Sequence, residues 1–148
     1  MLVAVLPASP KSAQETIRAL LEADQLTAPV HVRAIYRDPA KAPAEFVAHG
    51  SFHAVAGDLS NAASLDLGNA DTVFAITPPR YDGTDMMQWA RQASENTRAA
   101  IQKAGTVKRL VLLSSMGAEQ PEGTVRVPPY RGLYEQVRRL INSHREKS

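Results

Sequence analysis

Tyr134 and Arg138 have the spacing of two residues that act together on one face of a helix. They lie four residues apart in the segment 130–144, where apolar residues recur with a helical period. A phenol can exchange a proton with a reacting group, and a second hydroxyl, that of Ser114, follows a predicted strand. Arginine keeps its positive charge but is no proton relay. The other interpretation, which the sequence favours, makes Tyr134 an aromatic residue at the edge of the core and Arg138 a surface charge.

A second group of residues is cationic and suits a phosphate. Arg37 directly follows the segment 31–36 (HVRAIY), whose β-rich alternation predicts a strand, and Lys41 comes four residues later. A guanidinium can bind a phosphate through two parallel hydrogen bonds. The alternative is a solvated charge that pairs with Asp38. The residues leave both interpretations open.

The first strand, turn and helix of the sequence form a place where a phosphate could dock. Residues 3–6 are apolar and predict a short buried strand, and the apolar residues of 13–21 fall on one helical face. Ser12 and Glu15 have the spacing of a capping box, so we expect the helix to begin at Ser12. The N–H groups at the start of a helix attract anions, above all where the helix follows a strand directly.

The turn within this segment carries proline where phosphate-binding turns carry glycine. Pro7 and Pro10 have no N–H to offer, and proline fixes φ at about −65°. Losing up to two hydrogen bonds to a charged group, at roughly 1.5–3 kcal/mol each, would weaken binding by about two to four decades. Side-chain donors of Ser9, Lys11 and Ser12 could replace part of this attraction. The sequence slightly favours the alternative, a rigid turn that binds no phosphate.

Strands and helices alternate along the whole sequence. Beyond the first pair, strands are predicted at 31–36, 53–56, 72–77 and 110–113, and helical segments at 43–49, 61–67, 84–103 (ended by Gly105) and 130–144. The runs TVFAIT and LVLL are typical of strands covered on both faces. We therefore expect an α/β fold, a three-layer, doubly wound parallel sheet of about five strands in the order 3-2-1-4-5. A ligand crevice is expected at the carboxyl ends of the first and fourth strands.

Composition excludes several classes of function. The 148 residues contain no cysteine and carry a formal net charge of only +2, which rules out disulfides and thiolate metal sites and gives no strong attraction to polyanions. We expect one domain, 1–148, with a cytoplasmic location, no membrane span, no metal site and no nucleic-acid partner. The basic last helix is interpreted as a solvated face. The histidines have no ligand spacing; they are His31, His49, His53 and His144.

Four phrases carry a resemblance to a known family. They are VRAIYRDPAK (32–41), AGDLSNAASL (56–65), ADTVFAITPP (70–79) and AGTVKRLVLLSSMGAE (104–119). In this order and spacing they resemble the NmrA-like branch of the atypical short-chain dehydrogenase/reductases. The resemblance covers nearly the whole chain but only the N-terminal half of a typical member, so we expect the family's C-terminal substrate region to be absent.

The resemblance implies an NAD(P)-binding Rossmann fold, used for reduction or for sensing the redox state of the nicotinamide. The family's first turn, T-G-A-T-G-x-x-G, is matched by residues 6–13, with Pro7, Pro10 and Ala13 in the places of its glycines. Arginine at the position of Arg37 suits the 2′-phosphate of NADP, residues 58–59 match the adenine side, and 77–79 match the segment near the nicotinamide ribose. The expected cofactor-binding residues are Ser9, Lys11, Ser12, Arg37, Lys41, Asp58, Leu59, Thr77 and Pro78.

We therefore expect a small NmrA-like NAD(P)-binding protein, for redox sensing or related to reductases, with weakened binding of NADP or NAD. If active, it would be an NAD(P)H-dependent oxidoreductase. Short-chain reductases use a tyrosine as general acid, a lysine four residues later and a serine that orients the carbonyl group. The resemblance implies the first and last of these roles for Tyr134 and Ser114, but Arg138 stands where the catalytic lysine would be. The alternative is a cofactor-free regulatory or protein-interaction module, a pseudoenzyme whose last strand offers an exposed edge to a protein partner. A truncated gene product without activity is a third possibility.

Overall fold

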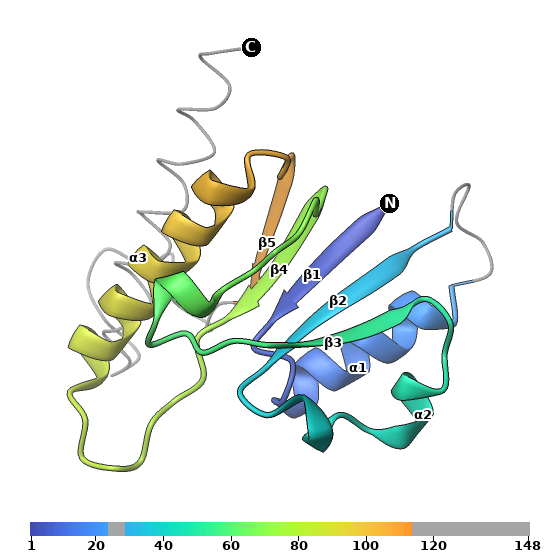
Figure 1. Cartoon of the computed structure of the whole chain (residues 1–148). Helices are drawn as coiled ribbons and strands as arrows, with labels where there is room; N and C mark the ends of the chain where they lie inside the picture. The colour runs from blue at the N-terminus through green and yellow to red at the C-terminus, as the bar shows by residue number, and fades with distance from the viewer. Residues whose placement is uncertain (24–28, 114–148) are drawn as a thin grey trace.

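The computed structural model describes residues 1–23 and 29–113 of the chain, and the predicted helix 130–144 lies outside them. Within these residues, five strands alternate with three helices and two short 3-10 turns, η1 and η2, arranged as Figure 1 shows. The elements are β1 (Leu2–Leu6), α1 (Lys11–Leu21), β2 (His31–Tyr36), η1 (Pro39–Lys41), α2 (Ala44–Val47), β3 (Phe52–Ala56), η2 (Ala62–Ser64), β4 (Thr72–Ile76), α3 (Met86–Ala104) and β5 (Arg109–Leu113).

All strand pairs are parallel, and the strand order is β3-β2-β1-β4-β5. This confirms the order expected from the sequence. Val5 of β1 pairs with Ala34 on one side and with Phe74 on the other. Because every strand runs in the same direction, the segments that follow β1, β2, β3 and β4 leave the sheet at a single edge.

Two hydrophobic cores lie on the two faces of the sheet. Figure 1 shows α1 and α2 on one face and α3 on the other. Ala13 and Ile17 of α1 pack with Phe46 of α2 and with alternate side chains of β1 and β2. On the opposite face, Trp89 and Ala93 of α3 pack with the other side chains of the strands. Burial on both faces explains the near-continuous apolar character of the central strands.

The amino-terminal ends of three strands are joined through Asp71. Its carboxylate accepts a hydrogen bond from the N–H of Leu2, at 3.0 Å, and its main-chain oxygen accepts from the N–H groups of Lys108 and Arg109. The hydrogen bond from Leu2 and the charge of Lys108 hold the pKa of the Asp71 carboxyl below its ordinary value. One residue thus connects β1, β4 and β5 at the edge opposite the crevice.

The predicted start of the first helix is wrong by one residue. Helix α1 begins at Lys11, with Pro10 at the N-cap, and no side chain caps it. Glu15 pairs with Arg18 at 2.8 Å, so the capping box of Ser12 and Glu15 does not form. The physical reason is that Pro10 adopts φ −60° and ψ 147°, the extended geometry of an N-cap residue, and needs no N–H there.

The expected two-sided burial of the fifth strand is also wrong. Leu110 and Leu112 pack against the core beneath α3, but Val111 is 50% exposed and Leu113 is 42% exposed. The reason is the position of β5 at the end of the strand order, with alternate side chains pointing to opposite faces. Gly105 ends α3 in the left-handed conformation, φ 68°, as the sequence predicts.

Candidate functional site

A pocket with a volume of about 380 Å³ opens at the carboxyl ends of β1, β2, β3 and β4. This volume lies within the range of small-ligand sites, about 300–1,000 Å³. The last residues of β1 and β2 and the segments that follow β1, β2, β3 and β4 supply most of its wall, and the start of α3 supplies the rest. The lining residues are Leu6, Pro7, Ser9, Pro10, Ile35, Arg37, Gly57, Asp58, Leu59, Leu65, Pro78, Pro79, Arg80 and Trp89.

Arg37 enters the pocket from the end of β2. It is exposed, and within the described ranges its side chain makes no ion pair or hydrogen bond. The suggested pair with Asp38 is absent, because the Asp38 carboxylate accepts a hydrogen bond from the N–H of Ala40, at 3.1 Å, and so caps η1. The guanidinium of Arg37 is therefore available to a ligand.

Asp58 follows β3 and is the one carboxylate among the described residues that line the pocket. Ser60 donates two hydrogen bonds to its Oδ1, one from the main-chain N–H and one from the hydroxyl, both at 2.8 Å. Burial raises the pKa of the Asp58 carboxyl, but the hydrogen bonds from Ser60 and the charges of Arg37 and Arg80 lower it, and the result is a pKa below the ordinary value. Asp58 is thus ionised at neutral pH and accepts hydrogen bonds.

The segment that carries Asp58 is packed tightly against its neighbours. A Cβ on Gly57 would lie 2.6 Å from Cγ2 of Ile35 and 3.0 Å from the carbonyl oxygen of Ser64, so only glycine fits there. Leu59 is 7% exposed, and its carbonyl oxygen accepts a hydrogen bond from Nδ2 of Asn96 on α3, at 2.7 Å. These contacts fix the wall of the pocket on the β3 side.

Arg80 and Trp89 form the wall on the α3 side. The Cζ atom of Arg80 lies 4.2 Å from the centroid of the Trp89 ring, a cation–π contact. Trp89 Nε1 donates a hydrogen bond to the carbonyl oxygen of Pro78, at 2.9 Å, which ties α3 to the segment after β4. Neither Arg80 nor Trp89 was among the sequence predictions. The available signals were an arginine soon after a strand's carboxyl end and the sole tryptophan of the chain.

The turn between β1 and α1 offers few main-chain donors. Pro7 and Pro10 line the pocket without N–H groups, and the N–H of Ala8 donates to the carbonyl oxygen of Ile35, at 2.8 Å. The N–H of Ser9 and the first N–H groups of α1, which have no acceptor within the helix, are the donors that remain at this turn. The turn therefore presents fewer main-chain N–H groups than a turn with glycine at these positions would.

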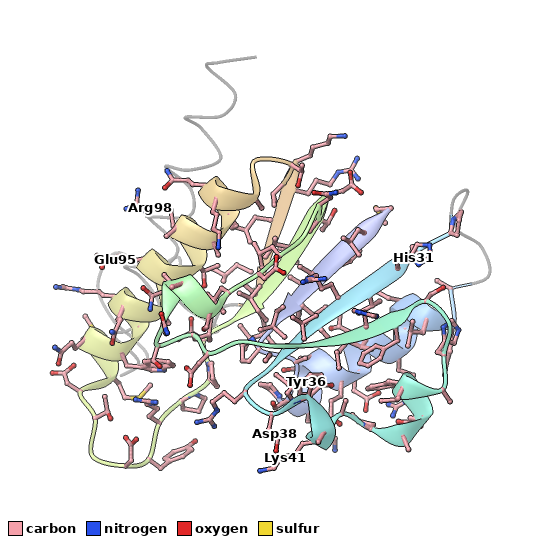
Figure 2. All side chains as sticks on the ribbon, in the orientation of Figure 1. His31, Tyr36, Asp38, Lys41, Glu95 and Arg98 are labelled. Carbon is pink, nitrogen blue, oxygen red and sulfur yellow. The ribbon has the colours of Figure 1, made fainter. Side chains whose placement is uncertain are left out.

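The pocket brings together five of the nine residues predicted to bind a cofactor: Ser9, Arg37, Asp58, Leu59 and Pro78. The other four, Lys11, Ser12, Lys41 and Thr77, do not line it. Lys41 is exposed at the outer edge of the molecule, below the carboxyl end of β2 (Figure 2), whereas Thr77 is buried at 5% exposure. The candidate catalytic residues Ser114, Tyr134 and Arg138 lie outside the described residues.

Two findings concern metal ions and membranes in the described ranges, 1–23 and 29–113. They contain no group of three His, Cys, Asp or Glu side chains that could hold a metal ion. In the same part of the chain, no helix is long and apolar enough to cross a membrane.

Comparisons with known proteins identify a family and a shared fold. A family model described as NAD(P)H-binding matches residues 8–147. A search of curated proteins gave no significant match.

Several solved structures share the fold at low sequence identity. The triphenylmethane reductase of Citrobacter sp., complexed with NADP(H), is 20% identical with a TM-score of 0.67, over 97% of this chain and 46% of that one. The Escherichia coli NADPH-dependent quinone oxidoreductase QOR2, complexed with NADPH, is 19% identical with a TM-score of 0.62. The match covers 97% of this chain and 45% of that one. A putative NAD-dependent epimerase/dehydratase from Bacillus halodurans is 20% identical with a TM-score of 0.69. The match covers 94% of this chain and 65% of that one. The chain thus spans 45% to 65% of the length of these proteins.

Proposed function

Because the chain belongs to the NAD(P)H-binding family, within the superfamily of NmrA-like proteins and atypical short-chain dehydrogenase/reductases, we propose that its pocket binds a nicotinamide dinucleotide. We further propose that it prefers NADP(H) to NAD(H). The observation that carries this proposal is the guanidinium of Arg37, which makes no ion pair or hydrogen bond among the residues that the structure describes and lines the same pocket as Asp58 and the first turn.

Charge and geometry support the preference for NADP(H). Arg37 follows β2, the strand whose end meets the adenosine ribose in dinucleotide-binding folds, and a guanidinium binds a phosphate in two-pronged fashion. Asp58 is ionised and accepts hydrogen bonds, so it suits the amino group of adenine. Leu59, Leu65 and Ile35 provide the apolar surface on which a base can lie.

The first turn implies that this binding is weak. Pro7 and Pro10 remove two main-chain N–H donors, and the N–H of Ala8 already donates a hydrogen bond to the carbonyl oxygen of Ile35. The affinity is then about two to four decades below that of a turn with glycine at both positions.

Two uses of a bound dinucleotide remain compatible with this pocket. When bound, the nicotinamide supplies the hydride for reduction, as in oxidoreductases of the superfamily. A redox sensor, by contrast, needs unequal affinities for the oxidised and reduced forms, because only a differential affinity shifts a conformational equilibrium. Measuring the oxidised and reduced dinucleotides side by side separates the two uses.

The proposal is tested by titration calorimetry with NADP⁺, NADPH, NAD⁺ and NADH at millimolar concentration. We expect heat with the two 2′-phosphorylated forms, and Arg37→Ala should lower their affinity about tenfold or more, since a hydrogen bond to a charged group is lost. Arg98→Ala is the matched control, because Arg98 is an exposed arginine on α3 that does not line the pocket (Figure 2). Absence of binding by all four dinucleotides would contradict the proposal and favour the cofactor-free module.

A further inference from the structure

Arg80 has a defined position at the pocket although it lies in a connecting segment. Its main-chain N–H donates to Sδ of Met86, at 3.3 Å, and its guanidinium contacts the ring of Trp89. Trp89 is itself fixed, since it is 4% exposed and its Nε1 is hydrogen bonded to Pro78. Contacts with α3 thus hold the guanidinium at the wall of the pocket.

The stacking leaves the donors of Arg80 available. The Cζ atom of Arg80 lies over the Trp89 ring, and a guanidinium carries five N–H donors, more than one contact with a ring can use. The ion pair of Arg80 is with Asp82, at 4.0 Å between Nε and Oδ2, which is too long for a hydrogen bond, and Asp82 is exposed. Within the described ranges the Arg80 side chain donates no hydrogen bond to the protein.

The pocket has an excess of positive charge. In the part of the chain that the structure describes, its charged lining residues are Arg37, Asp58 and Arg80, two guanidiniums and one carboxylate. The charges of both arginines reach Asp58, since both lower its pKa. A pocket of this kind favours an anionic ligand.

Strand order places Arg80 and Arg37 on different sides of the first turn. β1 lies between β2 and β4, and its Leu6 pairs with Ala75 of β4. Neighbouring strands lie about 4.8 Å apart, so the segments that follow β2, β1 and β4 leave the sheet side by side in that order. Arg37 follows the first of these strands and Arg80 the last, with the turn 7–10 between them.

We propose that Arg80 binds the pyrophosphate group of the nucleotide and replaces main-chain donors that Pro7 and Pro10 cannot supply. The inference rests on the proposed function, because it names the residue that binds the central pyrophosphate of the proposed dinucleotide. Arg37 then recognises the 2′-phosphate, and Arg80 recognises the pyrophosphate that NAD(H) and NADP(H) share. Stacking on Trp89 orients the guanidinium before binding, which lowers the entropic cost of the contact.

The test compares ligand fragments that contain or lack each phosphate. Adenosine, ADP, inorganic pyrophosphate, 2′-AMP and NADPH are titrated against the full chain, with calorimetry and the fluorescence of the sole tryptophan, Trp89, as readouts. Arg80→Gln should weaken ADP, pyrophosphate and NADPH about ten- to a hundredfold and leave adenosine and 2′-AMP unchanged. Arg37→Gln should weaken 2′-AMP and NADPH but not ADP. Arg80→Lys should keep part of the ADP affinity, and Arg98→Gln should change nothing.

The outcomes separate this inference from the proposed function. If the dinucleotide binds but Arg80→Gln leaves ADP unchanged, the inference is overturned while the function stands. Equal losses for adenosine and ADP would also overturn it, since Arg80 would then support the base or the wall of the pocket. If ADP and pyrophosphate bind through Arg80 but no dinucleotide does, the anion site stands and the function falls. A wild-type chain that binds none of these ligands contradicts both.

Discussion

Asn96, in the middle of α3, donates a hydrogen bond from its Nδ2 to the carbonyl oxygen of Leu59, at 2.7 Å. The two residues are far apart in sequence, and their contact joins the helix on one face of the sheet to the segment that presents Asp58. The position of a pocket carboxylate thus depends on a side chain that does not itself line the pocket.

Replacing Asn96 by Ala should therefore reduce both stability and ligand affinity. The carbonyl oxygen of the buried Leu59 would lose its partner, which costs about 1–3 kcal/mol in the free energy of unfolding. Urea denaturation measures this loss. Glu95→Ala is the matched control, since Glu95 is the adjacent, exposed residue of α3 (Figure 2), and it should stay within about 0.5 kcal/mol. Equal effects of the two substitutions would contradict the assignment.

Gly57→Ala should destabilise the fold and distort the pocket. The added methyl group would lie 2.6 Å from a side-chain carbon of Ile35, and overpacking of this kind costs about 1–3 kcal/mol. Gly50→Ala provides the control, because nothing lies within 4 Å of a Cβ at that position. Thermal and urea unfolding of the two variants are compared. A Gly57→Ala protein as stable as the Gly50→Ala protein would show that the contact to Ile35 relaxes freely.

Removing either arginine of the pocket should raise the pKa of Asp58. The charges of Arg37 and Arg80 both lower this pKa, and the hydrogen bonds from Ser60 lower it further. An NMR titration of the Asp58 carboxyl carbon in Arg37→Gln and Arg80→Gln reads the shift directly. A variant whose Asp58 titrates at the wild-type pH would show that the removed charge does not act on this carboxylate.

The same pKa gives a sign for the pH dependence of stability. The folded-state pKa of Asp58 lies below its ordinary value of 3.8. Its ionised form therefore stabilises the fold at pH values above that ordinary value, and this contribution is lost as the pH falls through the folded-state pKa. Asp58→Asn should flatten the fall in unfolding free energy on this acid side. Urea titrations at several pH values measure the unfolding free energy. If it falls with decreasing pH as steeply in Asp58→Asn as in the wild type, the expected contribution of Asp58 is contradicted.

Restoring glycine to the first turn should strengthen dinucleotide binding. A triple variant that combines Pro7→Gly, Pro10→Gly and Ala13→Gly regains two main-chain N–H donors. Its affinity for NADPH should rise by about two to four decades. The third substitution also removes a buried methyl from α1 and should cost about 1 kcal/mol of stability. A folded triple variant that still does not bind NADPH would place the loss outside the turn.

The glycine variants also measure how Arg80 and the turn depend on each other. If Arg80 substitutes for missing main-chain donors, Arg80→Gln should cost less affinity in the glycine background than in the wild type. A double-mutant cycle on NADPH affinity measures this coupling. Strict additivity of the two changes would indicate that Arg80 and the turn contact different parts of the ligand.

The sequence predicts the sheet well because burial on both faces leaves a direct mark on it. Continuous apolar strands that alternate with helices require a parallel sheet, and the observed strand order follows from standard crossovers. The start of α1 is predicted less well, since a capping-box pattern at Ser12 competes with the backbone geometry that Pro10 imposes. Local patterns do not say which of two overlapping signals determines the first turn of a helix.

The pocket is predicted only in part, because some of its residues are positioned by contacts between distant segments. Arg37 and Asp58 directly follow strands, so their place at the crevice can be derived from the strand pattern. Arg80 is different, since its position depends on stacking against Trp89 and on the hydrogen bond from Trp89 to Pro78. Neither contact has a sequence pattern of its own.

The position of Asp71 has a consequence for how this fold can change. Its hydrogen bonds join three strands at their amino-terminal ends, whereas the pocket lies at the carboxyl-terminal ends of the strands. The hydrogen bonds that hold the strands together and the residues that line the pocket thus lie at opposite ends of the strands. The scaffold can accept new chemistry in residues 7–10, 57–60 and 77–80 while the opposite edge preserves the register, which makes this domain a suitable starting point for designing nucleotide sites.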